Sequence, residues 1–124
     1  IEDGLPVFAT CAGLILLAEQ IGNDDRSYFK TLPVTVKRNA YGRQLGSFYI
    51  EEECKEIGII PMTFIRAPYI ESAKPEVEVL AKENNHIVAV QYKNQIGISF
   101  HPELDEDTRL HAYFVRLVEQ RMAA

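Results

Sequence analysis

Residues 5–17, LPVFATCAGLILL, decide the fold class. Leu5–Thr10 is a short apolar, partly β-branched run that predicts a buried strand, with Pro6 at its entry, where the missing N–H costs least. From Ala12 to Ile21 nearly all residues are good helix formers, and Gly22 stands where a left-handed C-terminal cap is expected. A strand, a sharp turn bearing Cys11 and an apolar helix are typical of an α/β unit.

The rest of the chain alternates apolar runs with polar or proline-containing segments. Lys93 and Asn94 separate two such runs by a two-residue turn, which indicates an antiparallel hairpin. A stripe of apolar residues at helical spacing predicts a terminal amphipathic helix: Leu110, Phe114, Leu117 and Val118. The expected strands are Leu32–Lys37, Leu45–Ile50, Met62–Arg66, Val77–Ala81, Ile87–Tyr92 and Gln95–Phe100, with Pro61 and Pro68 as punctuation. We therefore expect an α/β fold with one mixed sheet flanked by helices.

Composition excludes several classes of function. The 124 residues are 47% hydrophobic, 25% charged and 10% aromatic, and 13 Lys plus Arg against 18 Asp plus Glu give a net charge of -5. Such a chain has no uniform basic field for nucleic acid or for an anionic membrane. The longest apolar run, Leu14 to Ala18, is far too short to span a bilayer. Small ligands and protein partners fit this composition better.

The two cysteines call for separate explanations. Two are too few for a disulfide framework, so we expect reduced thiols in a cytoplasmic protein. Cys54 lies in the acidic stretch Glu51–Glu56, which is expected to be solvated and to raise the thiol pKa, so we assign it no chemistry. His86 and His111 are expected to be structural or surface residues, because neither has a Cys or carboxylate at ligand spacing for a metal.

Cys11 stands between the predicted strand and the first residue of the predicted helix. The helix dipole and unpaired backbone N–H groups there favour a thiolate and are expected to lower the pKa of the thiol. Ala12 and Gly13 are small enough for the sharp turn of a nucleophile elbow. The same N–H groups suit an oxyanion formed when sulfur attacks a carbonyl. A buried structural cysteine is the alternative, and Cys11 alone does not decide between the two.

The segment Ser99-Phe100-His101-Pro102-Glu103 follows a predicted strand. Active sites of α/β sheets usually assemble at strand ends. Pro102 blocks a helix, and in an extended chain residues two apart point to the same side, so the Glu103 carboxylate is placed to orient the His101 imidazole. A cysteine nucleophile needs such a base and orienting group. Taken alone, the pair could be a solvated surface pair; together with Cys11 it indicates a nucleophilic site.

Four segments together resemble one family along essentially the whole chain. They are Phe8–Ile15, Arg38–Gln44 followed by Ser47-Phe48, Phe64–Pro68 and Ser99–Leu104. In this order they are similar to the glutaminase subunits of pyridoxal 5'-phosphate synthase, which are class I glutamine amidotransferases of the Cys-His-Glu type. The cysteine and His-Pro-Glu elements are shared by many class I amidotransferases, whereas the arginine segments are more specific. The resemblance implies a flavodoxin-like α/β fold.

The resemblance also implies roles for individual residues. Cys11 would attack the side-chain amide of glutamine, His101 would act as general base and then acid, and Glu103 would orient His101. The backbone of Ala12 would contribute to the oxyanion hole. Residues Arg38, Ile65 and Arg66 would bind the substrate L-glutamine, and a guanidinium fork suits its α-carboxylate. No cofactor or metal is implied.

The implied partner is the synthase subunit, with which the glutaminase would form a hetero-oligomer and to which it would pass ammonia. The sequence departs from the family at Ala9, where the elbow has glycine. The family's upstream section, with a Gly-Gly-Glu-Ser loop that completes the oxyanion hole, does not occur in residues 1–124. We therefore expect residues 1–124 to be the C-terminal portion of a single larger glutaminase domain. The alternatives are the glutaminase of another class I system and a non-catalytic interaction module.

Overall fold

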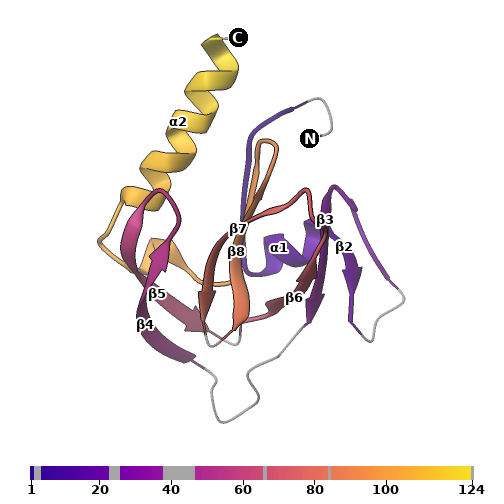
Figure 1. Ribbon diagram of the computed structural model, residues 1–124, viewed down its shortest axis with the longest axis horizontal. Coiled ribbons are helices and arrows are strands. Elements are labelled where there is room, and N and C mark those ends of the chain that lie inside the picture. Colours follow the sequence, from indigo (N-terminus) through magenta and orange to yellow (C-terminus); the bar gives the residue numbers. More distant parts are fainter. Residues whose placement is uncertain (2–3, 23–25, 38–46, 66, 84, 124) are drawn as a thin grey trace.

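The computed structural model describes residues 1, 4–22, 26–37, 47–65, 67–83 and 85–123 (Figure 1). Its elements, in chain order, are β1 (Val7–Thr10), α1 (Ala12–Leu17), β2 (Ala18–Ile21), β3 (Leu32–Lys37), β4 (Ser47–Cys54), β5 (Gly58–Ile65), β6 (Tyr69–Ala73), β7 (Glu78–Glu83), β8 (His86–Tyr92), β9 (Gln95–Ile98), the 3-10 turn η2 (Pro102–Leu104) and α2 (Arg109–Ala123).

Seven strands form one mixed sheet. Its order is β1-β9-β8-β6-β3-β2, and β7 pairs with β8 off this path. The pairs β1–β9 and β2–β3 are parallel, whereas β8–β9 and β3–β6 are antiparallel. Tyr92 lies opposite Gln95 across the Lys93-Asn94 turn, so the predicted hairpin is confirmed.

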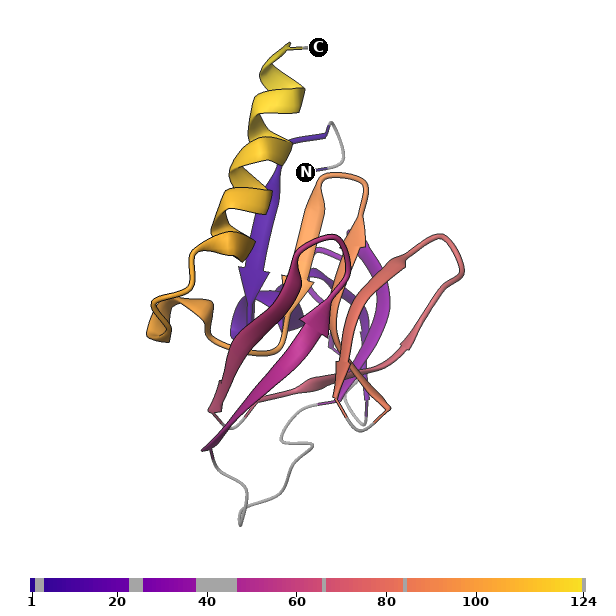
Figure 2. The ribbon, with the colours of Figure 1, turned by 60° about the vertical axis from the view of Figure 1, so that its left-hand side comes forward.

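Strand β9 is buried on both faces because the sheet separates two apolar clusters. Ile96 and Ile98 belong to the cluster beneath α2 and the β4–β5 hairpin, together with Phe100 and Leu110. Gly97 points to the opposite face, where an added Cβ would lie 2.8 Å from Leu14 Cδ1 of α1. This alternation is the period of two expected of a strand. Figure 2 shows α2 running alongside β1, as the predicted apolar stripe requires.

The prediction of a single sheet is incomplete. Strands β4 and β5 form a separate two-stranded antiparallel sheet, paired from Ser47–Ile65 to Cys54–Gly58. Pro61 lies within β5 and does not end it. The hairpin packs its inner face on the main core, and the Lys55 N–H donates to the Leu80 carbonyl of β7 over 2.7 Å. It occupies the side of the molecule opposite β2 and β3 (Figure 1).

The predicted helix over residues 12–21 is too long. Helix α1 ends at Leu17, and residues 18–21 form β2, whose residues Ala18, Gln20 and Ile21 pair with β3. Gly22 is consequently not a helix cap; its N–H donates to the Val36 carbonyl. Pairing with β3 overrides the local helix propensity of this segment.

The first strand is less buried than predicted. Strand β1 begins at Val7, Leu5 is 56% exposed, and of the four residues of β1 only Ala9 is buried. The reason is topological, since β1 stands at one end of the strand order and pairs with β9. Within the described part of the chain, no helix is long and apolar enough to cross a membrane.

Candidate functional site

Cys11 occupies a strained backbone conformation at the junction of β1 and α1. Its φ is 50° and its ψ is -104°, a combination rare for residues other than glycine. Its N–H donates to the Ile98 carbonyl over 2.9 Å, which fixes the junction against the end of β9. Strained conformations of this kind concentrate at active sites, and the strand-to-helix turn is that of a nucleophile elbow.

The elbow tolerates Ala9 because Gly13 has no side chain. Ala9 is buried, and a Cβ built on Gly13 would lie 3.3 Å from the Ala9 Cβ. The two positions flank Cys11 by two residues on each side and face each other across the turn. One methyl group therefore fits between strand and helix, and a second one would crowd the turn.

This packing predicts a specific pair of stability effects. Gly13→Ala should lower the free energy of unfolding by about 1 kcal/mol, because crowding against Ala9 outweighs the gain in helix propensity. The exchange variant Ala9→Gly/Gly13→Ala keeps one methyl group and should regain most of that loss. Urea denaturation of the parent, the single variant and the exchange variant tests this. Equal stability of Gly13→Ala and the exchange variant would contradict the packing argument.

The expected lowering of the Cys11 pKa is wrong. Partial burial of the thiol raises its pKa most, and the negative charge of Glu103 raises it further, whereas a hydrogen bond from the Ala12 N–H lowers it. Burial outweighs the short helix α1, so the thiol needs a base to become a nucleophile.

His101 and Glu103 form the pair expected from the sequence. Nδ1 of His101 lies 2.8 Å from Oε2 of Glu103. The geometry differs from the extended chain expected, because Pro102 starts the 3-10 turn η2 as its first residue. The turn is closed by the Leu104 N–H, which donates to the His101 carbonyl over 3.2 Å. The contact between the Glu103 carboxylate and the His101 imidazole is therefore made by a tight turn and not by an extended chain.

Glu103 keeps its negative charge in this arrangement. Partial burial would raise its pKa, but its own backbone N–H, the His101 hydrogen bond and the charges of His101 and His111 lower it overall. A carboxylate ionised at neutral pH can hold the His101 Nδ1–H and leave Nε2 free for proton transfer.

The sheet brings the cysteine and the histidine to one edge. Thr10 lies opposite Ile98 in the parallel pair β1–β9, so Cys11 and Ser99 both follow strands that end side by side. His101 comes two residues later, and the charge of Glu103 acts on the Cys11 thiol. The structure therefore gathers Cys11, His101 and Glu103 at the carboxyl ends of β1 and β9.

The structure describes some of the remaining predicted residues and not others. Arg38 and Arg66 lie outside the described residues. Ile65 is the last residue of β5 and is 42% exposed. Ala12 is the first residue of α1; it is exposed, and its N–H donates a hydrogen bond to the Cys11 sulfur. Cys54 is fully buried rather than solvated, and burial raises its pKa to about 11. Its strand alternates, so Cys54 faces the core while Glu51 and Glu53 face outward.

Two residues beside the site were missed by the sequence reasoning. The Thr63 carbonyl accepts the His101 N–H over 2.8 Å, and Thr63 Oγ1 donates to both Asp105 oxygens, at 3.2 and 3.0 Å. Thr63 and Asp105 stand 42 positions apart in sequence, so no local pattern indicates the contact.

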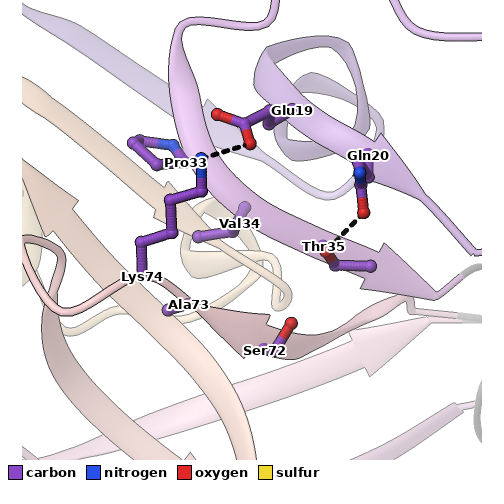
Figure 3. A pocket seen from close by; sticks show the side chains of 8 residues that line it. All are labelled: Glu19, Gln20, Pro33, Val34, Thr35, Ser72, Ala73 and Lys74. Carbon is purple, nitrogen blue, oxygen red and sulfur yellow. Dashed lines mark hydrogen bonds and ion pairs between the residues drawn. The ribbon is translucent and has the colours of Figure 1, made fainter.

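A separate open hollow lies on β2, β3 and the end of β6 (Figure 3). Its Lys74 ammonium is 2.6 Å from Oε1 of Glu19, and Thr35 Oγ1 donates to Gln20 over 3.4 Å. Because Glu19 neutralises Lys74, the hollow offers little to an anionic group. The described residues contain no cluster of three or more His, Cys, Asp or Glu side chains fit to hold a metal ion.

The sequence of the chain is similar to a known protein family and to curated proteins. Residues 1–120 match the model of the SNO glutamine amidotransferase family. The chain is 69% identical over 115 residues to the pyridoxal 5'-phosphate synthase subunit PdxT of Desulfitobacterium hafniense, a match that covers 93% of the chain and 58% of that protein. It is 58% identical to the subunit of the same name from Streptococcus pneumoniae, covering 98% of the chain and 63% of that protein. The chain thus spans about three fifths of the length of these curated relatives.

Solved structures agree on the fold. A crystal structure of a glutamine amidotransferase superposes with a TM-score of 0.88 at 43% identity, covering 94% of the chain and 62% of that protein. A Thermotoga maritima glutamine amidotransferase, at 15% identity and a TM-score of 0.59, covers 99% of the chain and 52% of its own length and supports the fold alone. The predicted α/β fold with a mixed sheet is confirmed as that of glutamine amidotransferases.

Proposed function

Because the chain belongs to the SNO glutamine amidotransferase family, we propose that it is the catalytic part of a glutaminase that hydrolyses L-glutamine to glutamate and ammonia. The observation that carries the proposal is the strained Cys11 at the end of β1 beside the hydrogen-bonded pair of His101 and Glu103. We further propose that residues 1–124 are the C-terminal portion of a single larger domain; the coverage of 58% and 63% of the two relatives supports that the chain corresponds to part of a longer protein.

The first half of the reaction transfers the γ-glutamyl group of glutamine to the Cys11 sulfur. His101 takes the proton from the Cys11 thiol as the sulfur attacks the side-chain amide carbon, and the carbonyl becomes an oxyanion. The Ala12 N–H donates a hydrogen bond to that oxyanion. Collapse of the intermediate breaks the C–N bond, and the leaving nitrogen takes the proton from His101 to depart as ammonia. The product on the enzyme is a γ-glutamyl thioester of Cys11.

The second half releases glutamate. His101 takes a proton from water, whose oxygen attacks the thioester carbon. The carbon–sulfur bond then breaks, and the sulfur recovers the proton from His101. Glu103 carries a negative charge throughout and stabilises the imidazolium that forms in each half. The raised pKa of Cys11 makes the base essential, since the free thiol is protonated at neutral pH.

Substrate binding is assigned to Arg38, Ile65 and Arg66. An arginine fork holds an α-carboxylate with two parallel hydrogen bonds, and this supports the assignment on chemical grounds. Ile65 ends β5, the strand whose Thr63 carbonyl accepts the His101 N–H, and this link between β5 and the His101 backbone supports the proposal for Ile65.

The partner we propose is the synthase subunit of a pyridoxal 5'-phosphate synthase, in a cytoplasmic hetero-oligomer. The support is the name shared by the relatives at 58–69% identity, which is that of a subunit of this synthase. Ammonia released at Cys11 would pass to that subunit for pyridoxal 5'-phosphate (vitamin B6) synthesis.

Covalent labelling tests the proposal. Diazo-oxo-norleucine, a glutamine analogue with an electrophilic carbon, should modify Cys11 of the full-length protein in the presence of the synthase subunit, and glutamine should protect it. Mass spectrometry of the peptides locates the adduct. Cys54 is the internal control, because its burial and its pKa of about 11 keep it unreactive.

A Cys11→Ser variant should take up no label, and an equally labelled variant would mean that the reagent reacts elsewhere. If the full-length protein with its partner forms no adduct at Cys11, the enzyme proposal fails. The chain would then be the non-catalytic interaction module of the same fold.

A further inference from the structure

The turn that carries His101 and Glu103 is held at both ends by one residue of β5. At its start, the His101 N–H donates to the Thr63 carbonyl over 2.8 Å. At its end, the Thr63 hydroxyl donates to the Asp105 carboxylate, with oxygen–oxygen distances of 3.0 and 3.2 Å. Only the bond through the Thr63 side chain depends on which residue stands at that position.

Thr63 is a rigid anchor because its neighbours are locked into the core. Met62 and Phe64 are fully buried. The Phe64 ring stacks on Phe48 with centroids 4.6 Å apart and meets the edge of Phe100, the residue before His101, at 5.7 Å. The strand and the approach to the turn therefore form one packed unit, against which the turn is fixed.

Asp105 accepts the hydrogen bond from the Thr63 hydroxyl, whereas the nearby Asp107 binds a different residue. Asp107 holds the Arg109 guanidinium, with Nη2 and Nε at 2.6 and 3.0 Å from its Oδ2. Arg109 Nη2 also donates to the Ile59 carbonyl, which ties β5 to the start of α2. Asp105, one residue after η2, has both carboxylate oxygens within hydrogen-bond distance of the Thr63 hydroxyl.

We infer that Thr63 and Asp105 are positioning residues, whose side-chain hydrogen bond closes the turn over residues 101–105 and sets where the His101 imidazole stands relative to Cys11. This inference rests on the proposed function for its kinetic consequence. Neither side chain is assigned a contact with glutamine. Both act through the turn, and a displacement of about 1 Å at a reacting group costs about 100-fold in rate.

Paired variants separate positioning from folding. Thr63→Val removes the donor at nearly constant shape, and Asp105→Ala removes the acceptor; each should lower kcat for glutamine by about 10-fold to 100-fold and leave KM unchanged. Thr63→Ser and Asp105→Asn keep a donor and an acceptor and should stay near the parent. The double variant Thr63→Val/Asp105→Ala should lose no more than either single variant, because both remove the same bond.

Thr35→Val is the matched control. Thr35 also stands on a strand and donates a side-chain hydrogen bond, to Gln20 over 3.4 Å. Its strand, β3, lies toward the end of the strand order opposite to β1 and β9. This variant should keep the parent kcat. The inference would be overturned if Thr63→Val and Thr35→Val lowered kcat equally. It would also be overturned if the kcat loss of Thr63→Val/Asp105→Ala equalled the product of the two single losses.

A readout without substrate keeps the inference separable from the proposed function. The rate of Cys11 alkylation by iodoacetamide, followed over about pH 6–9, reports how readily His101 takes the thiol proton. Thr63→Val and Asp105→Ala should shift this profile toward that of His101→Ala, and Thr63→Ser should not. If glutamine is not hydrolysed but the profile shifts, the proposed function fails and the positioning role stands. An unshifted profile overturns the positioning role.

Discussion

Replacing His101 with alanine is expected to abolish ammonia release from glutamine in the full-length protein while leaving binding of the proposed synthase partner intact. The Cys11 pKa is raised by burial and by the Glu103 charge, so the thiol without His101 stays protonated at neutral pH. Loss of a general base costs about 10²–10⁴-fold in rate. The measurement is ammonia release in a coupled assay, with the complex followed by gel filtration.

His86→Ala is the matched control for this variant. His86 begins β8, which runs antiparallel to β9, so it lies at the same sheet edge as the carboxyl end of β9. Its ring is stacked on Tyr69 of β6, with ring centroids 4.3 Å apart. The His86→Ala variant should hydrolyse glutamine at close to the parent rate. Activity of His101→Ala near the parent level would refute the assignment of Cys11, His101 and Glu103.

The parts of the fold that the sequence predicted are those set by local patterns. The strand of residues 32–37 and the hairpin across Lys93-Asn94 follow from alternation and turn chemistry, and α2 follows from its stripe. The error over residues 18–21 has the opposite origin. These residues have good helix propensity, and pairing with β3, more than ten positions away, makes them a strand.

The same distinction applies to the site. Cys11 at a strand-to-helix turn and Glu103 two residues after His101 are local features, and the sequence predicted both. The Cys11 pKa was predicted in the wrong direction because desolvation depends on tertiary burial, which the helix-start argument omits. The contact of Thr63 with Asp105 joins distant segments, so it required the structure.

The largest stability effect is expected at Phe64. Its side chain is fully buried between Phe48 and Phe100, and alanine would leave a cavity beneath the β4–β5 hairpin. Phe64→Ala should lower the free energy of unfolding by about 3–5 kcal/mol. Urea denaturation followed by circular dichroism measures this loss, and Phe64→Leu, which refills most of the volume, should lose much less.

Phe29→Ala provides the comparison at an exposed site. Phe29 is 59% exposed, so its removal should change the free energy of unfolding by no more than about 0.5 kcal/mol. Similar losses for Phe64→Ala and Phe29→Ala would mean that the hairpin does not pack on the core. Because Phe100 precedes His101 and meets the Phe64 ring, the cavity should also loosen the turn of residues 101–105. We therefore expect Phe64→Ala to lower kcat under conditions in which it remains folded, whereas Phe29→Ala should not.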